Sequence, residues 1–140
     1  MKTVIMAGGF GTRLRPLTCN LPKPMVSIAN KPMMEHIINL LKKHNLKDIV
    51  ALLFFRGEEI KNYFEDGSKF GVKIEYVTST EDYGTAGSVK NAEGQLHSGS
   101  GSGEKERVLV ISGDVLTDID LSKAIDFHTQ NKASATLVLS

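Results

Sequence analysis

Seven consecutive apolar residues, 49–55, place the strongest constraint on how this chain can fold. A strand whose side chains are all apolar has to be covered on both faces, as the inner strands of parallel sheets are. The run is too short to cross a bilayer, and the sequence holds no apolar segment of sufficient length. We therefore expect a parallel sheet that lies between two layers of helices.

Strand and helix patterns alternate along the whole chain. Strands are predicted at 2–6, 49–55, 72–77, 107–112 and 134–139. Helices are predicted at 58–65, from Thr85 to about Leu96, after a cap at Asp120, and with Pro32 in the first turn and Asn30 or Lys31 as the cap. Right-handed crossovers favour a Rossmann-like three-layer α/β/α domain with a mostly parallel sheet. With the strands numbered along the chain, the expected order is 3-2-1-4-5. Strand 72–77 alternates apolar and polar residues, which predicts an edge strand.

The length and net charge of the chain are those of a single globular domain. The 140 residues are enough for a sizeable core, so 1–140 is interpreted as a single nucleotide-binding α/β domain. The net charge of +1 gives no field that would attract nucleic acid or an anionic membrane. Cys19 is the one cysteine and cannot form an internal disulfide, which agrees with a cytoplasmic location.

Residues 97–106 contain a tract of alternating glycine and serine. Such a composition is typical of a flexible linker. Natural loops can have it, but the strict alternation also resembles an engineered insert. In either case we expect this segment to be flexible and to carry no chemistry.

A glycine-rich loop follows the first strand directly, with glycines at Gly8, Gly9 and Gly11. Glycines let backbone N–H groups approach a ligand closely, and a row of such groups binds anions. Arg13 adds a planar guanidinium that suits phosphate oxygens. Lys23 adds a mobile point charge, and the prolines on both sides of it restrict its backbone. This stretch predicts a site for a polyphosphate.

Two well-known phosphate loops are excluded. The dinucleotide fingerprint needs a third glycine where this chain has Leu14, and the Walker loop closes with Gly-Lys-Ser/Thr, a triplet that the sequence lacks. A glycine-rich turn that only links a strand to a helix would explain the glycines. It would not explain the presence of Arg13 and Lys23 as well.

The stretch Gly8–Thr18, together with Pro22–Pro24, resembles the signature of the sugar nucleotidyltransferases. That signature is Gly-Gly-x-Gly-Thr-Arg-Leu-x-Pro-Leu-Thr followed by Pro-Lys-Pro. The Gly-Thr-Ala-Gly segment Gly84–Gly87 and the pair Gly113–Asp114 also match the family, and their style is nearest to the mannose-1-phosphate guanylyltransferases. The resemblance implies the N-terminal portion of a nucleotide-diphospho-sugar transferase fold.

The resemblance also implies roles for individual residues. Arg13 would grip the β- and γ-phosphates, and Lys23 would stabilise the charge that develops during transfer. Asp114, directly after an apolar strand and a glycine, would bind Mg²⁺. Thr85 would contact the nucleotide, and it can in addition be a helix N-cap. The residues implied in nucleotide binding are Ala7, Gly8, Gly9, Gly11 and Thr12 in the loop, and Tyr83, Gly84, Thr85 and Ala86 in the second segment.

The predicted topology brings these motifs together. In a parallel sheet, the loops after the first, third and fourth strands open at the same edge. The glycine-rich loop, the segment Tyr83–Gly87 and Asp114 are therefore expected to surround one crevice.

The implied reaction is nucleotidyl transfer from a nucleoside triphosphate, with GTP favoured, to a sugar 1-phosphate, with mannose 1-phosphate favoured. The expected partners are these two substrates, with Mg²⁺ as cofactor, and neither nucleic acid nor a membrane. Self-association through an open sheet edge beside the last strand is the oligomeric contact that the pattern suggests. Family catalytic domains are longer and supply a second metal-binding aspartate, so impaired turnover is expected. The alternatives are a non-catalytic nucleotide-binding or regulatory module and an engineered minimal scaffold.

Overall fold

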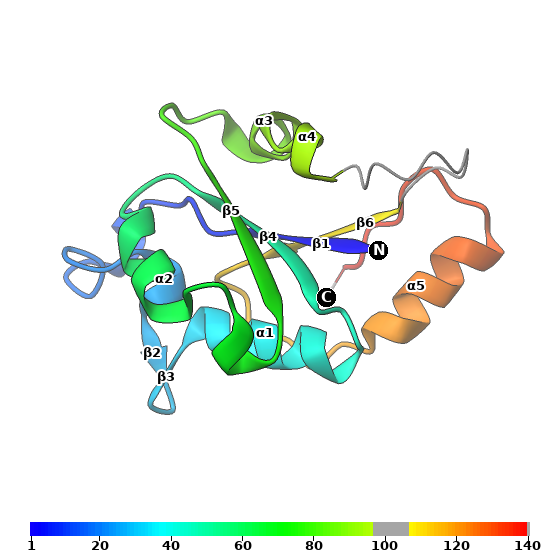
Figure 1. Ribbon diagram of the computed structural model, residues 1–140, viewed down its shortest axis with the longest axis horizontal. Helices are drawn as coiled ribbons and strands as arrows, with labels where there is room; N and C mark the ends of the chain where they lie inside the picture. Colours follow the sequence, from blue (N-terminus) through cyan, green and yellow to red (C-terminus); the bar gives the residue numbers. More distant parts are fainter. Residues whose placement is uncertain (97–106, 140) are drawn as a thin grey trace.

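The computed structural model describes residues 1–96 and 107–139. Four parallel strands form its main sheet, in the order β5-β4-β1-β6 (Figure 1). Their bounds are Lys2–Met6 for β1, Asp48–Leu53 for β4, Lys73–Thr78 for β5 and Val108–Ser112 for β6. This order confirms the predicted arrangement of the first four strands, with 72–77 at an edge. The predicted flexible tract at 97–106 lies outside the described residues.

Each face of the sheet is covered by helices, because alternate strand residues enter two different cores. On one face, α1 (Met33–Lys43), α2 (Gly57–Phe64) and α5 (Leu121–Gln130) pack against Ile5 and its neighbours. On the other, α3 (Gly84–Asn91) and α4 (Glu93–Leu96) cover Val4 (Figure 1). Every residue of 49–53 is at most 4% exposed, as the apolar run predicts. Burying a large apolar side chain stabilises the fold by about 1.5–3 kcal/mol.

A short hairpin leads from the glycine-rich loop into α1. β2 (Ser27–Ile28) pairs with β3 (Lys31–Pro32) in antiparallel fashion. Ala29 and Asn30 form the turn between them, with φ of 50° and 63°. Positive φ at both central residues is the geometry that two-residue hairpins prefer. α1 begins at Met33 with Pro32 as its N-cap. The predicted cap at Asn30 or Lys31 is wrong, because these two residues belong to the hairpin.

At the other end of the chain, Asp120 caps α5 as predicted. Its side chain accepts a hydrogen bond from the Lys123 backbone N–H at 3.1 Å. This bond satisfies one of the N–H groups that the first helical turn leaves without an intrahelical partner. Within the described ranges 1–96 and 107–139, no helix is both long and apolar enough to cross a membrane.

Two predicted elements differ from the structure. The helix expected from Thr85 to Leu96 is divided into α3 and α4, with the fully buried Ala92 between them. Glycines within this stretch lower its helix propensity. Residues 134–139 do not form the fifth strand, and Leu137 and Leu139 are 85% and 88% exposed. A strand there would pair on one side only, and no layer covers its apolar side chains, so the alternating pattern alone does not hold it in the sheet.

Candidate active site

The glycine-rich loop leaves β1 at the carboxyl edge of the sheet. The Ala7 N–H still donates to the Leu52 carbonyl at 2.9 Å, so the loop starts in register with β4. A Cβ at Gly8 would lie 3.1 Å from Phe54 Cβ, whereas a Cβ at Gly9 would meet nothing within 4 Å. The loop backbone is therefore packed on one side at Gly8 and open at Gly9. This opening lets a ligand approach the backbone.

The far end of the loop folds back on itself. Gly11 has a φ of 63°, and a Cβ there would come within 2.9 Å of Thr18 Cγ2. The Thr18 hydroxyl donates to the Gly11 carbonyl at 2.6 Å. Lys23 opens a short 3-10 helix, η2 (Lys23–Met25), whose residues Pro24 and Met25 are buried. The backbone that carries Lys23 is thus anchored beside the loop.

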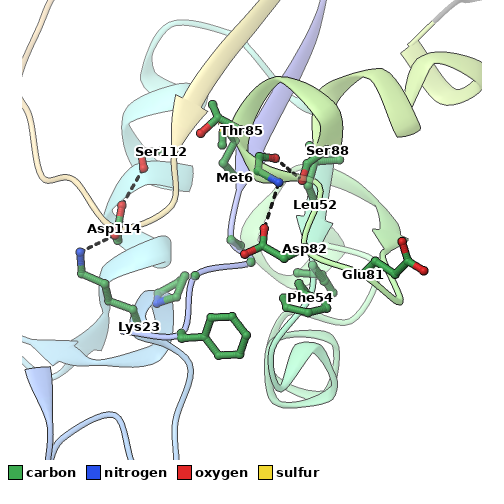
Figure 2. Close-up of a pocket in the computed structure, with 17 residues that line it drawn as sticks. Met6, Lys23, Leu52, Phe54, Glu81, Asp82, Thr85, Ser88, Ser112 and Asp114 are labelled. Carbon is green, nitrogen blue, oxygen red and sulfur yellow. Dashed lines mark hydrogen bonds and ion pairs between the residues drawn. The ribbon is translucent and has the colours of Figure 1, made fainter. Parts of the chain in front are cut away.

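A pocket of about 240 Å³ lies at this edge of the sheet (Figure 2). Its walls come from the loop after β1, the end of β4, the segment after β5 and the end of β6. The predicted site residues that line it are Ala7, Gly8, Gly9, Lys23, Gly84, Thr85 and Asp114. The expectation that the three motifs meet around one crevice is confirmed.

Lys23 and Asp114 form an ion pair inside the pocket. The Lys23 Nζ lies 2.5 Å from Asp114 Oδ2, and the two side chains are 28% and 24% exposed. Ser112 Oγ donates to Asp114 Oδ1 at 2.6 Å. Burial opposes ionisation of Asp114, but the hydrogen bonds from Lys23 and Ser112 outweigh it and hold the pKa of this carboxyl below its ordinary value. Asp114 is therefore a carboxylate at neutral pH.

The start of α3 forms the opposite wall. The Asp82 carboxylate accepts a hydrogen bond from the Gly84 N–H at 2.9 Å, and Gly84 has a φ of 62°. Thr85 lies inside the helix and lines the pocket, while Tyr83 occupies the N-cap position (Figure 2). The alternative role of Thr85 as an N-cap is therefore wrong, because Asp82 bonds the first N–H. N–H groups at a helix start favour a negatively charged ligand, but the Gly84 N–H is already bonded to Asp82, whose carboxylate also lines the pocket.

Other predicted residues lie near the pocket but do not line it. Arg13 is exposed, and its side chain makes no ion pair or hydrogen bond with any residue that the structure describes. Its guanidinium thus has no partner among the described residues. The other predicted site residues that do not line the pocket are Gly11, Thr12, Tyr83 and Ala86.

Ten residues that line the pocket were not among the predicted site residues: Met6, Phe10, Pro24, Leu52, Leu53, Phe54, Glu81, Asp82, Ser88 and Ser112. The rings of Phe10 and Phe54 meet edge to face with centroids 5.3 Å apart. Phe10 is the variable residue of the Gly-Gly-x-Gly pattern, so the motif says nothing about it. Ser112 had a signal, since it stands two residues before Asp114 and a serine hydroxyl at that spacing can reach the carboxylate.

The sheet order, with a loop of glycines at the carboxyl end of a central strand, defines a doubly wound α/β protein with its ligand pocket at the strand ends. The sequence model of the family described as Nucleotidyl transferase matches residues 2–140. The chain belongs to this family.

Several proteins are similar to the chain. It is 41% identical over 142 residues to a mannose-1-phosphate guanyltransferase from Yarrowia lipolytica, covering 99% of this chain and 37% of that protein. It is 37% identical over 142 residues to a UTP–glucose-1-phosphate uridylyltransferase from Synechocystis sp., again covering 99% and 37%. The crystal structure of HddC from Yersinia pseudotuberculosis complexed with GMP-PN has a TM-score of 0.77 at 29% identity, over 91% of this chain and 53% of that one. The chain thus spans about 38% of the length of the curated relatives that it matches.

Proposed function

We propose that this chain binds a nucleoside triphosphate and a sugar 1-phosphate and transfers the nucleotidyl group between them, releasing pyrophosphate. The observation that carries the proposal is the pocket in which Gly9, Lys23, Thr85 and Asp114 meet. Its members come from four separate segments, and each supplies a group that suits a phosphate or a metal ion. GTP and mannose 1-phosphate are the favoured substrates, because similar proteins include mannose-1-phosphate guanylyltransferases.

Two sets of backbone groups suit the phosphates. The loop backbone is open at Gly9 and α3 lines the pocket at Thr85, so backbone N–H groups of these two segments would contact the phosphates. Arg13 would bind the terminal phosphates from outside, and Lys23 would approach from η2. The apolar pocket residues Leu52 and Phe54 would exclude water near the nucleoside. A water-poor wall strengthens the electrostatic contacts beside it.

The proposed reaction is an in-line displacement. An oxygen of the sugar phosphate forms a bond to the α-phosphorus while the bond to pyrophosphate breaks, and pyrophosphate leaves with the electron pair. The chain needs no covalent intermediate, since positioning and charge neutralisation suffice for this chemistry. Lys23 balances the charge that grows on the transferring group.

Asp114 fits Mg²⁺ as one ligand among several. Among residues 1–96 and 107–139, no group of three or more His, Cys, Asp or Glu side chains is placed to hold a metal ion. Mg²⁺ at nucleotide sites is bound by one or two carboxylates together with substrate phosphates and water, so a single carboxylate facing a phosphate pocket suits it. When bound, the ion would neutralise phosphate charge and orient the leaving group.

Binding is tested by calorimetric titration of GTP with Mg²⁺ against the chain and the Arg13→Ala variant. Charge-assisted hydrogen bonds contribute about 1.5–3 kcal/mol, so the variant should bind GTP about ten- to a hundredfold more weakly. Arg15→Ala is the matched control, since Arg15 is also exposed and stands two residues away. Equal GTP binding by Arg13→Ala would remove Arg13 from its role.

Activity is tested by pyrophosphate release from GTP with mannose 1-phosphate, and from UTP with glucose 1-phosphate. Release in either reaction supports transfer, and the faster one identifies the preferred base. Because impaired turnover is expected, slow release supports the impaired enzyme, whereas magnesium-dependent GTP binding with no release at all would instead support a nucleotide-binding module. Absence of any nucleotide binding would favour the minimal scaffold.

Two further parts of the proposal concern the setting of the reaction. A cytoplasmic location agrees with Cys19, an exposed and free thiol. Self-association through the outer edge of β6, which has no strand partner in the described part of the chain, stays a prediction. Sedimentation of the purified chain at several concentrations tests it.

A further inference from the structure

The two carboxylate oxygens of Asp114 have different partners. Ser112 Oγ donates to Oδ1 at 2.6 Å, while Lys23 Nζ lies 2.5 Å from Oδ2 (Figure 2). Both interactions lie on one side of the pocket, and all three side chains come from its wall. The carboxylate is thus held by a neutral hydroxyl on one oxygen and by a cation on the other.

Ser112 is the more rigid of the two partners. It is the last residue of β6 and pairs in register with Met6 of β1. The next residue, Gly113, donates its N–H to the Met6 carbonyl at 2.8 Å. Ser112 and Gly113 are therefore both fixed to the central strand, and the Ser112 hydroxyl orients the Asp114 carboxylate through its bond to Oδ1. Lys23, by contrast, has an anchored backbone but a long side chain with four rotatable bonds.

We propose that Ser112 is a positioning residue that reserves Oδ2 of Asp114 as the cation-binding oxygen, and that Lys23 occupies this oxygen until a divalent cation replaces it. The inference rests on the proposed function, because it concerns the same pocket. Lys23 and a divalent cation cannot share Oδ2, since like charges at such a distance repel strongly. Lys23 leaves Oδ2 and its ammonium becomes available to the nucleotide phosphates.

This exchange links two binding events through one residue. Without a ligand, Lys23 and Asp114 neutralise one another, while the carboxyl side chains of Glu81 and Asp82 also line the pocket. When the divalent cation replaces Lys23 at Oδ2, the Lys23 ammonium is left unpaired beside the proposed phosphate site. Binding of the cation to Asp114 therefore favours binding of the nucleotide. Ser112 would keep its bond to Oδ1, so that Oδ2 would be the oxygen left for a cation.

The test titrates Mn²⁺, as an EPR-active substitute for Mg²⁺, against the chain without nucleotide. Lys23→Met should bind Mn²⁺ about five- to tenfold more tightly, because the metal no longer has to break an ion pair worth up to about 1 kcal/mol or tolerate a neighbouring cation. Ser112→Ala should bind it about tenfold more weakly, since loss of a group that orients a metal ligand costs about ten- to a hundredfold in affinity. Ser112→Thr, which keeps the hydroxyl, should restore the affinity.

The chain offers a matched control for each variant. Ser68 Oγ donates to Asp66 Oδ1 at 2.6 Å across the same two-residue spacing, and Lys69 Nζ lies 2.6 Å from Glu65 Oε1. Neither pair lines the pocket. Ser68→Ala and Lys69→Met should leave Mn²⁺ affinity unchanged. Circular dichroism establishes that each variant is folded before titration.

Mn²⁺ affinity of Lys23→Met equal to or weaker than that of the unmodified chain would overturn the exchange. Affinity of Ser112→Ala equal to that of the unmodified chain, or failure of Ser112→Thr to restore it, would overturn the positioning role. Since these titrations contain no nucleotide, they are independent of the GTP experiments. A chain that binds no GTP but shows the Mn²⁺ pattern would refute the proposed function and leave this inference standing.

Discussion

Gly113 donates its backbone N–H to the Met6 carbonyl at 2.8 Å, which ties the turn carrying Asp114 to the last residue of β1. A Cβ at position 113 would lie 2.8 Å from that same oxygen and 3.2 Å from Ile5 Cγ2. The close approach that joins the two halves of the pocket is therefore one that glycine alone permits. The glycine of the Gly-Asp pair has a structural purpose of its own.

Gly113→Ala should lower the free energy of unfolding by about 1–3 kcal/mol, the usual cost of an added methyl in a tightly packed place. The contacted atom belongs to the backbone and cannot turn away. Urea denaturation followed by circular dichroism measures the change. Gly94→Ala is the control, because a Cβ in that helix meets nothing within 4 Å and should stabilise the chain by about 0.5–1 kcal/mol. Equal stability of the two variants would contradict the packing argument.

Gly9→Ala should separate binding from folding. A Cβ at Gly9 meets nothing within 4 Å, so the free energy of unfolding should change by less than about 0.5 kcal/mol. The methyl would, however, occupy space at the pocket, and GTP affinity should fall by about tenfold in calorimetry, equivalent to about 1.4 kcal/mol. Gly11→Ala, by contrast, should also lower the free energy of unfolding, because Gly11 has a φ of 63° and a Cβ there would lie 2.9 Å from Thr18 Cγ2. Unchanged GTP affinity in Gly9→Ala would remove the loop from the phosphate site.

Much of the fold follows from local patterns in the sequence. The apolar run before Phe54 and the short strand before Gly8 are buried on both faces, and right-handed crossovers then favour the doubly wound order that the four strands have. The meeting of the three motifs follows from the same rule, because parallel strands place their following loops at one edge. Periodicity and handedness are local or general properties, so one sequence contains them.

The structure differs from the sequence-based predictions where contacts between distant segments determine the conformation. Residues 134–139 have the pattern of a strand, yet a strand also needs a neighbour and a covering layer. The charges of Lys23 and Asp114 each predicted a ligand, but nothing in the sequence states that the two bind one another at 2.5 Å. Arg13 matches the motif and still lies outside the pocket lining, since a motif fixes residue types and not side-chain direction.

Glu35 predicts a pH dependence of stability. It is 8% exposed, and it accepts a hydrogen bond from the Tyr63 hydroxyl at 3.0 Å and pairs with Lys31 at 3.0 Å. Burial alone would raise the pKa of Glu35, but these two partners outweigh it and lower the pKa below the ordinary 4.5. The unfolded chain then binds the proton more readily, so this stabilisation is present above about pH 4.5 and is lost as the pH falls through the lower folded value.

Urea denaturation between pH 3 and pH 7 tests this dependence. Stability of the unmodified chain should fall more steeply below about pH 4.5 than that of Glu35→Gln, which keeps an acceptor for Tyr63 but has no carboxyl to titrate. Tyr63→Phe removes one of the bonds that lower the pKa of Glu35 and should give an intermediate slope. Parallel curves for all three proteins would show that Glu35 does not titrate differently on unfolding.

Substitution of Asp114 should lower GTP affinity, whereas substitution of Asp120 should lower stability, because Asp114 lines the pocket and Asp120 caps a helix. Asp120→Ala removes the bond to the Lys123 N–H and should lower the free energy of unfolding by about 0.5–2 kcal/mol, with no change in magnesium-dependent GTP affinity. Asp114→Asn keeps an acceptor for Ser112 but loses the charge that attracts the metal ion. Its GTP affinity in Mg²⁺ should fall by at least about tenfold, since removing a ligand is no milder than removing the group that orients it. Calorimetry and urea denaturation on both variants measure the two effects, and a loss of GTP affinity in Asp120→Ala equal to that in Asp114→Asn would move the metal site away from the end of β6.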